Sequence, residues 1–352
     1  MSEDPLSRKV RDLALELSGL SGEEPEFVDF LEKHGIANYL LSKDGLLART
    51  RGIQLVAKSL SLRDSLKSLG QLFRENDMPY LSLKGAALSQ LCYGSPLIRQ
   101  FGDLDVLVEP HQAARACELL RGAGFVDYRP KGLVPPQAAA HYKYGKAITF
   151  ERGSLIVDLH WKLYSHWLCL SVDHAEIWNR SQTVCLADKR ATPTLGLEDT
   201  LLFLVFHGSQ DGWEKLKGLT DLAAFLYRHT NLDYNYCVIA SGVRLPLFET
   251  GLSLAHLLLE APLPPETRIR FGSRSEAITY LKGCMELGPP KHKLLRARYF
   301  EGSWYKVLAL RVRALLTPSV DDISATIHSR PEFYLASRVR NLIVKSWRRE
   351  RA

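Results

Sequence analysis

The fold is decided by the stretch Leu81–Val108, which reads LSLKGAALSQLCYGSPLIRQFGDLDVLV. It begins as a short apolar strand, turns at Lys84-Gly85 into a helical pattern, and returns after Gly102 to a second apolar strand. That second strand carries Asp103 and Asp105. Side chains two positions apart on a strand point to the same side. We therefore expect these two carboxylates to face one place.

A second acidic strand follows later in the chain. The stretch Ile156–Trp161, IVDLHW, is an apolar run that carries Asp158, which could bring a third carboxylate to the first two. Converging carboxylates repel one another unless a cation neutralises them. Mg²⁺ prefers oxygen ligands and keeps positions open for substrate phosphates. The simplest chemistry that this pattern predicts is metal-assisted phosphoryl or nucleotidyl transfer.

The composition is that of a globular protein. The chain has 352 residues, of which 46% are hydrophobic and 24% charged, and its net charge is +7. The cysteines are scattered without a Cys-x-x-Cys pair, which favours a reducing compartment over a disulfide framework or a zinc site. No apolar run reaches the roughly 20 residues of a membrane span. We expect a cytoplasmic protein without a membrane span.

The order of elements predicts an α+β fold: a small mixed sheet forms a core at 70–190, between a helical region at 1–69 and a mostly helical domain at 191–352. Helical spacing of apolar residues precedes the core at Pro5–Leu20, Pro25–Leu41 and Leu46–Asn76. A hairpin is expected around Arg152-Gly153. Beyond Thr192 strand signals fade, and helices are expected at Leu195–Ser209, Trp213–Arg228, Val243–Leu259, Pro265–Phe271, Arg274–Met285, Lys293–Leu316 and Pro331–Arg349.

With these residues in hand, the chain resembles the uncharacterised nucleotidyltransferase family of the polymerase-β-like superfamily. The resemblance extends from about Gly45 onward. Its signature comprises Lys84-Gly85, Leu88, Tyr93-Gly94, Arg99, the block Gly102–Val108, the strand Asp158–Trp161, and His207-Gly208 with Trp213, Leu216 and Asp221. The chain departs from the superfamily at Gly85-Ala86, where a Gly-Ser or Gly-Gly pair is usual, and at Gln210, where relatives often carry a basic residue.

The resemblance implies a metal-dependent enzyme that binds ATP or another nucleoside triphosphate with two Mg²⁺ ions, Mn²⁺ being an alternative. The enzyme would transfer the nucleoside monophosphate of this triphosphate to a hydroxyl of an unidentified acceptor, and diphosphate would leave. Asp103 and Asp105 are expected to bridge both metals, and Asp158 to complete the ligand set. A solvent-facing strand edge is the structural alternative for Asp103 and Asp105, and a hydrogen-bonded acid at a strand end is the alternative for Asp158.

Four further residues are candidates for binding the nucleotide. Gly85 leaves bare backbone at a helix N-terminus, where N–H groups favour phosphate, although an ordinary tight turn fits as well. Lys84 could add a point charge, or be a solvated flank. Arg99 could neutralise phosphate or hold Asp105, and His160 shares a strand face with Asp158 unless it is a structural histidine. His207 fits a helix core better than a site.

Two other functions agree with the same residues. Asp-x-Asp motifs also hold nucleotide sugars in metal-dependent glycosyltransferases, and the chain could be a non-catalytic nucleotide-binding protein. The acceptor could be a small molecule, a peptide or a protein. Nucleic acid is not favoured, because the basic end of the chain, Arg338–Arg351, has Trp347 as its single aromatic residue and fits a solvated helix.

Overall fold

The computed structural model describes residues 4–287, apart from 23–24, 45–48, 133–134, 166–167, 169, 171, 187–190 and 265, together with 305, 308, 312 and 317. The helices expected at Lys293–Leu316 and Pro331–Arg349 lie outside these residues, apart from three positions of the first, 305, 308 and 312.

The strands of the described residues belong to one mixed sheet. They are β1 (Leu81–Ser82), β2 (Leu104–Leu107), β3 (Val126–Arg129), β4 (Ala147–Arg152), β5 (Leu155–His160), β6 (Gln182–Cys185) and β7 (Ala191–Thr194). Their order is β3-β4-β5-β2-β1-β7-β6. The pairs β2–β5 and β1–β7 are parallel, and β3–β4, β4–β5 and β6–β7 are antiparallel. The predicted α+β fold with a mixed sheet is confirmed.

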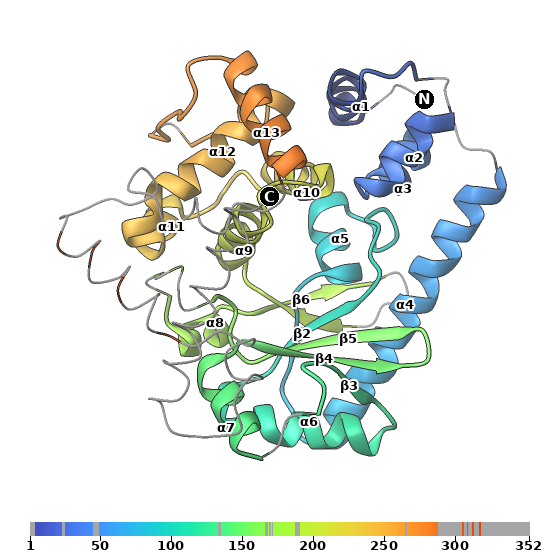
Figure 1. The fold of residues 1–352 in the computed structure, drawn as a ribbon, viewed down its shortest axis with the longest axis vertical. Helices are drawn as coiled ribbons and strands as arrows, with labels where there is room; N and C mark the ends of the chain where they lie inside the picture. The colour runs from blue at the N-terminus through green and yellow to red at the C-terminus, as the bar shows by residue number, and fades with distance from the viewer. Residues whose placement is uncertain are drawn as a thin grey trace, which may run out of the picture. The chain divides into compact units, whose positions relative to one another are not determined.

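The helices account for most of the other residues that the structure describes (Figure 1). They are α1 (Pro5–Ser18), α2 (Pro25–Lys33), α3 (Ala37–Asp44), α4 (Arg49–Glu75), α5 (Gly85–Tyr93), α6 (Ala113–Gly122), α7 (Pro135–Tyr144), α8 (His174–Asn179), α9 (Leu197–Gln210), α10 (Leu216–Arg228), α11 (Tyr234–Ser241), α12 (Leu245–Leu259) and α13 (Arg274–Leu287).

Two of the predicted helices differ from the structure. The single helix expected over Pro25–Leu41 is divided into α2 and α3 at Gly35, whose φ of +71° ends a helix. The helix expected over Pro265–Phe271 is wrong, because the described residues 266–271 form none. There the Arg270 N–H donates to Ser253 Oγ at 3.0 Å, and its guanidinium pairs with Glu249 of α12. Contacts with α12 replace the local helical hydrogen bonds.

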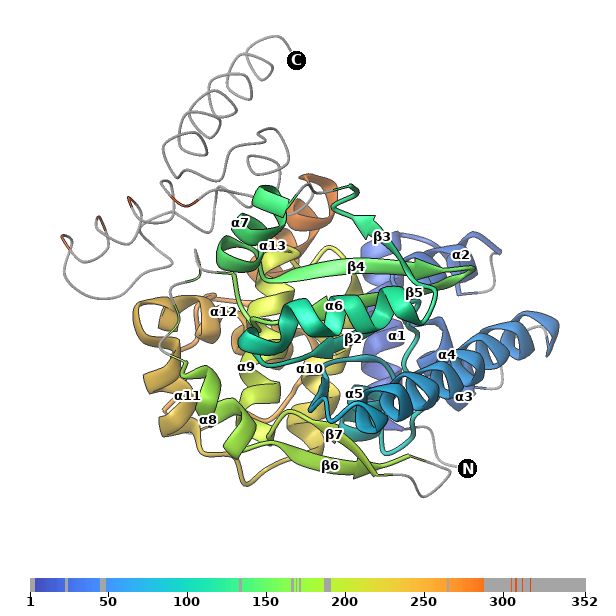
Figure 2. The same ribbon diagram turned by 90° about the horizontal axis from the view of Figure 1, so that it is seen from below.

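Contacts divide the chain into two compact units that interleave along the sequence. Unit 1 comprises Met1–Gly70, Leu81–Gly102 and Ser171–Glu301, and unit 2 comprises Gln71–Tyr80, Asp103–Leu170 and Gly302–Ala352. Unit 2 therefore contains β2, β3, β4 and β5, which lie side by side in Figure 2, with α6 and α7.

The core of unit 1 is a group of helices around α12. Helices α9 and α10 pack against α12 and against each other. Trp213, which is 2% exposed, lies among them, and two glycines make room for its indole ring. A Cβ on Gly208 would lie 2.3 Å from Trp213 Cζ3, and one on Gly251 would lie 3.0 Å from its Cζ2. Gly208 and Gly251 are therefore required by packing.

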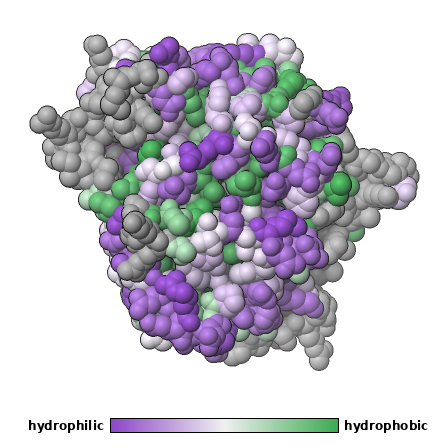
Figure 3. All heavy atoms as spheres, turned by 180° about the vertical axis from the view of Figure 1, so that it is seen from behind, coloured by the Kyte–Doolittle hydropathy of each residue, from purple (hydrophilic) through white to green (hydrophobic). Residues whose placement is uncertain are grey.

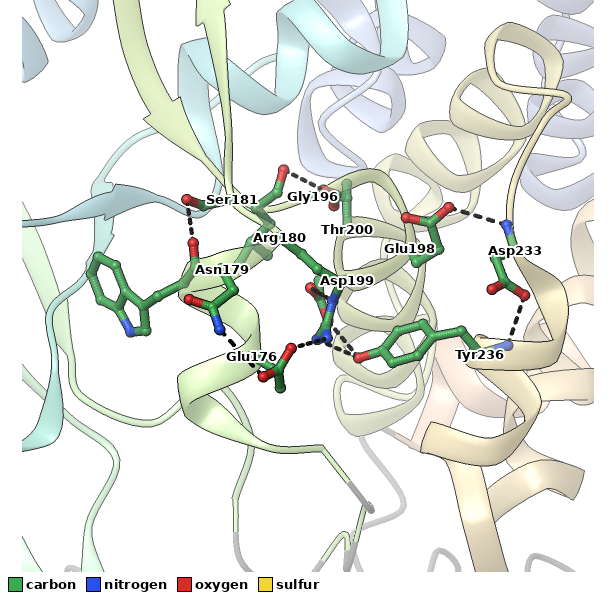
Figure 4. A network of polar contacts seen from close by, with 12 residues as sticks. Glu176, Asn179, Arg180, Ser181, Gly196, Glu198, Asp199, Thr200, Asp233 and Tyr236 are labelled. Carbon is green, nitrogen blue, oxygen red and sulfur yellow. Dashed lines mark hydrogen bonds and ion pairs between the residues drawn. The ribbon is translucent and has the colours of Figure 1, made fainter.

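A buried polar network joins α8, α9 and α11 within unit 1 (Figure 4). Arg180 donates from Nε and Nη2 to the fully buried carboxylate of Asp199, at 2.9 and 3.0 Å. The Tyr236 hydroxyl donates to Asp199 Oδ1 at 3.0 Å, and the guanidinium lies over the Tyr236 ring. Since the carboxylate is paired with a bidentate cation, its burial is compensated, and the network fixes the start of α9.

One described stretch, Tyr234–Leu259, meets the length and hydropathy of a membrane span. It comprises α11, a short 3-10 turn and α12, and 72% of its most apolar window is buried in the structure. Buried core helices pass the same test, because a helix that is apolar all round is expected in the interior of a large protein. By itself this stretch is weak evidence for a membrane.

Exposed hydrophobic residues occur at several places in the described chain. Val126 is 56% exposed, Ile239 is 71% exposed, and its neighbour Val238 is 41% exposed. On the face drawn in Figure 3, hydrophobic residues gather near the middle between hydrophilic ones. Single exposed apolar side chains are ordinary in folded proteins.

Candidate metal centre

The candidate metal centre is built on two neighbouring strands of unit 2, β2 and β5. Both strands carry apolar residues on either side of their acids, and β2 is buried along its whole length, as expected for the interior of a parallel pair. Their register places Asp105 opposite Asp158 and Leu107 opposite His160. Paired residues of parallel strands point to the same side, so the two carboxylates and the imidazole share one face.

The three side chains meet closely. One ligand atom from each of Asp105, Asp158 and His160 lies within 4.8 Å of the others. Asp105 is 3% exposed and His160 is 6% exposed, and His160 Nε2 lies 3.5 Å from Asp105 Oδ1. Asp158 is half-buried and accepts a hydrogen bond of 2.6 Å from the Thr149 hydroxyl of β4. The structure thus brings together three of the residues singled out in the sequence.

The electrostatics of this cluster favour a cation. Burial raises the pKa of the Asp158 carboxyl above its ordinary value, and the charges of Asp105 and Asp103 raise it further. The Thr149 hydrogen bond and His160 oppose this shift without reversing it. A carboxylate whose charge is disfavoured by burial and by like charges is stabilised when a divalent ion neutralises the group.

Asp103 lies two residues before Asp105, just ahead of β2, and is partly exposed. It is not one of the three residues whose ligand atoms meet, but its charge acts on Asp158. Its expected role as a metal ligand stays a prediction.

The donor set fits a divalent ion. Two carboxylates supply oxygen ligands, and a neutral imidazole supplies a nitrogen that suits Mn²⁺ and other transition metals better than Mg²⁺. Burial first, and then the charges of Asp105 and Asp103, disfavour the ionised form of Asp158, and a bound divalent ion would offset both effects. We conclude that Asp105, Asp158 and His160 form a candidate divalent-metal centre.

The Lys84-Gly85 bend belongs to unit 1, whereas the acidic cluster belongs to unit 2. Gly85 has a φ of +61° and begins α5, and a Cβ there would be 3.4 Å from the Phe101 ring. Lys84 Nζ lies 5.8 Å from the centroid of the Phe203 ring, a cation–π contact. The backbone therefore requires glycine here, and binding of phosphate by Lys84 and Gly85 stays a prediction.

Arg99 has a partner that the sequence did not indicate. Its side chain is 6% exposed, and its Nε donates to Asp221 Oδ2 of α10 at 2.8 Å. The Tyr93 hydroxyl donates to the other oxygen of Asp221 at 2.7 Å. Burial by itself would lower the pKa of Arg99, but the Asp221 charge and hydrogen bond outweigh it and raise the pKa. This arrangement favours a structural role over a phosphate contact.

The structure also describes Trp161 and His207, two further residues of the signature. Trp161 is 1% exposed and donates from Nε1 to the carbonyl oxygens of Tyr142, in the last turn of α7, and of Gly145, just after it, which fits a packing residue. His207 is 31% exposed and contacts the Asp211 carboxylate at 2.9 Å. His207 belongs to unit 1, whereas the acidic cluster belongs to unit 2.

Sequence reasoning missed Thr149 as a member of the centre. The predicted hairpin already indicated this residue. When Arg152 pairs with Leu155 around the turn, Thr149 lies opposite Asp158. The register of a hairpin follows from its turn. Counting residues outward from Gly153 would have identified this hydroxyl.

The sheet and its acidic cluster define an α+β protein with a candidate divalent-metal centre on adjacent parallel strands. A protein-family model described as an uncharacterised nucleotidyltransferase matches residues 26–260. The chain belongs to this nucleotidyltransferase family. A comparison with curated proteins found no match.

Proposed function

We propose that this protein is a metal-dependent enzyme that transfers a nucleoside monophosphate from a nucleoside triphosphate to a hydroxyl of an acceptor. The observation that carries the proposal is the register of Asp105 and Asp158 on adjacent parallel strands, with the pKa of Asp158 raised. Membership of the nucleotidyltransferase family supports the reaction class. ATP is the proposed donor because it is the most abundant nucleotide.

The residues of the centre have distinct roles in this proposal. Asp105, Asp158 and His160 would hold a divalent ion, Mg²⁺ or Mn²⁺, and Asp103 would join them in holding a second one. A divalent ion in such a site neutralises phosphate charge and polarises the α-phosphate. Thr149 fixes the Asp158 carboxylate through its hydrogen bond of 2.6 Å.

Asp158 lies in the same cluster as Asp105 and His160, and we assign it the role of the base that accepts a proton. As Asp158 takes the proton of the acceptor hydroxyl, the acceptor oxygen forms a bond to the α-phosphorus. The bond from that phosphorus to the bridging oxygen of the β-phosphate breaks, and diphosphate leaves with the electron pair.

The test is a transfer assay with the full-length protein, Mg²⁺ and a cell extract that supplies acceptors. ATP labelled at the α-phosphate should leave its label on an acceptor, whereas label at the γ-phosphate should be released in diphosphate. Asp105→Asn should lower the transfer rate by about 100-fold or more, because the centre loses a metal ligand. Glu118→Gln, a change of an exposed acid of unit 2, should leave the rate unchanged.

Two outcomes would contradict the proposal. Transfer of label from a nucleotide sugar, with none from ATP, would identify a metal-dependent glycosyltransferase. Binding of ATP and Mg²⁺ with equal affinity by the parent and by Asp105→Asn, without any transfer, would identify a non-catalytic nucleotide-binding protein.

A further inference from the structure

A cavity of about 340 Å³ opens within unit 1, among residues of four helices. It is lined by the start of α1, by Tyr39 of α3, by the end of α5 and by the last turn of α10. The acidic cluster of unit 2 contributes nothing to its lining. Its volume lies at the lower end of the range for small-molecule pockets, roughly 300–1,000 Å³, and suits a ligand of one or two rings.

Tyr93, which is partly exposed, gives the cavity an aromatic wall, and the buried ring of Tyr39 supports it from behind. The rings of Tyr39 and Tyr93 lie 5.1 Å apart between centroids and are tilted by 41°. The hydroxyl of Tyr93 donates to Asp221, and that of Tyr39 donates to Asp4 Oδ2 at 3.3 Å, so both rings are held from their far ends. Rigid aromatic faces favour a flat apolar body.

Arg228 brings a positive charge to the same cavity. Its guanidinium lies against the backbone of Gly94, where an added Cβ would be 2.8 Å from Nη1 and 3.1 Å from Cζ. The side chain is exposed, and no carboxylate pairs with it within the part of the chain that the structure describes. A guanidinium in this position can bind a carboxylate or a phosphate through two parallel hydrogen bonds.

Asp4, the acidic residue of the cavity lining, already accepts hydrogen bonds at both carboxylate oxygens. Asp4 caps α1, and its Oδ1 accepts from the Leu6 N–H at 3.2 Å while its Oδ2 accepts from Tyr39. It also lies at the positive end of the α1 dipole, which offsets its charge. The charge that remains for a ligand is therefore that of Arg228.

We infer that this cavity binds a small organic anion with a flat apolar body. The anionic group pairs with Arg228, and the body lies against Tyr93. A carboxylate and a phosphate monoester both have this chemistry. The inference does not depend on the proposed nucleotidyl transfer, because the cavity and the acidic cluster share no residue.

Calorimetry on the full-length protein tests the site with four probes, in EDTA so that the metal centre takes no part. Phenyl phosphate and benzoate carry both required groups, benzyl alcohol lacks the charge, and inorganic phosphate lacks the ring. We expect Kd values of about 0.1–1 mM for one or both aromatic anions, and binding about tenfold weaker for benzyl alcohol and for inorganic phosphate. The tighter of the two aromatic anions identifies the anionic group.

A pair of arginine variants localises the binding. Arg228→Gln should weaken binding of the tighter probe by about tenfold, because it removes a charge-assisted pair. Arg268→Gln, which changes another exposed arginine of unit 1, should leave binding unchanged. Unaltered circular dichroism of both variants would show that the fold is kept.

The inference is overturned by any of three results: no saturable binding of either aromatic anion to the parent, equal binding of benzyl alcohol or inorganic phosphate, or equal affinity of the parent and Arg228→Gln. None of these results bears on the transfer assay.

Discussion

At the residue scale, the proposed chemistry depends on two carboxylates that occupy the same register position on adjacent parallel strands. Asp105 and Asp158 lie opposite each other, and burial together with the neighbouring charges raises the pKa of Asp158. Repulsion between the carboxylates lowers the stability of the metal-free fold. A bound divalent ion attracts each carboxylate and offsets this repulsion. Binding of metal should therefore be visible as stability, independently of turnover.

Mg²⁺ or Mn²⁺ should raise the melting temperature of the parent protein relative to EDTA. An ion present at about 100 times its Kd adds about 2.7 kcal/mol to the free energy of unfolding. Asp105→Asn should lose most of this increase because it removes a ligand, and Glu118→Gln should keep it. Differential scanning calorimetry measures both. An equal metal-induced shift in the parent and in Asp105→Asn would place the ion elsewhere.

A second prediction concerns the buried pair of Arg99 and Asp221. Asp221→Asn leaves the guanidinium in the interior without its counter-charge, and breaking a buried pair costs about 3–5 kcal/mol. We expect urea denaturation to show a loss of about this size in the free energy of unfolding. Asp12→Asn, at an exposed position of α1, should change it by less than about 0.5 kcal/mol. A loss below about 1 kcal/mol for Asp221→Asn would mean that the pair is solvated.

At the element scale, α10 receives its N-terminal cap from a distant segment. Its own preceding residue, Lys215, provides no side-chain cap. Instead the Leu216 N–H donates to His34 Nδ1 at 3.4 Å, and the Lys217 N–H donates to the His34 carbonyl at 3.0 Å. An imidazole that accepts a hydrogen bond must be unprotonated at that nitrogen. Helix α10 is thus tied to the turn between α2 and α3.

This cap makes stability depend on pH. Burial, followed by the charges of Lys33 and Lys215, lowers the pKa of His34 from 6.5 to about 4. The unfolded chain binds the proton more readily, so the contribution of His34 is complete above pH 6.5 and is lost as the pH falls toward 4. The loss amounts to about 3 kcal/mol.

His34→Asn keeps an acceptor and removes the proton site, so urea denaturation between pH 7 and about 4 should show a smaller acid-dependent loss than in the parent. His111→Asn serves as the matched control, because His111 is 69% exposed. An unchanged pH dependence in His34→Asn would mean that His34 is not the group that titrates.

The elements differ in how far their sequence predicts them. Helix α4 and the hairpin of β4 and β5 follow from local patterns: an apolar stripe at helical spacing, and two runs around Arg152-Gly153. Strands β6 and β7 were not predicted. Both are four residues long, and β7 contains Pro193, which weakens its strand signal. Strand β7 is held by pairing with β1, where Ser82 lies opposite Thr194.

At the scale of the whole molecule, the chain passes repeatedly between its two units. The segment Leu81–Gly102 belongs with the helices of Ser171–Glu301, although it lies within the core that the sequence predicts at 70–190. Strand β1 pairs with β7, and α5 packs against α10. The partners β7 and α10 both lie beyond residue 190. The division at residues 69 and 190 therefore stays a prediction that a fragment can test.

A fragment of residues 70–190 should fail to fold cooperatively. It lacks Thr194, whose Oγ1 donates to the Ser82 carbonyl at 2.7 Å, and Asp221, the counter-charge of the buried Arg99. A fragment of residues 4–287 keeps both and should unfold in one urea transition with dispersed amide NMR signals. If 70–190 gave a cooperative transition and dispersed signals, the contiguous division would be correct.

The sequence by itself determined the elements and residues that depend on near neighbours in the chain. Two-residue periodicity directed attention to Asp105 on β2, although Asp103 lies just ahead of that strand, and the hairpin turn defines the register that brings Thr149 to Asp158. Only the tertiary structure decided that Arg99 pairs with Asp221, 122 residues away, and that His34 caps α10. Local backbone geometry acts within a few residues, whereas these partners are chosen by how helices distant in sequence pack together.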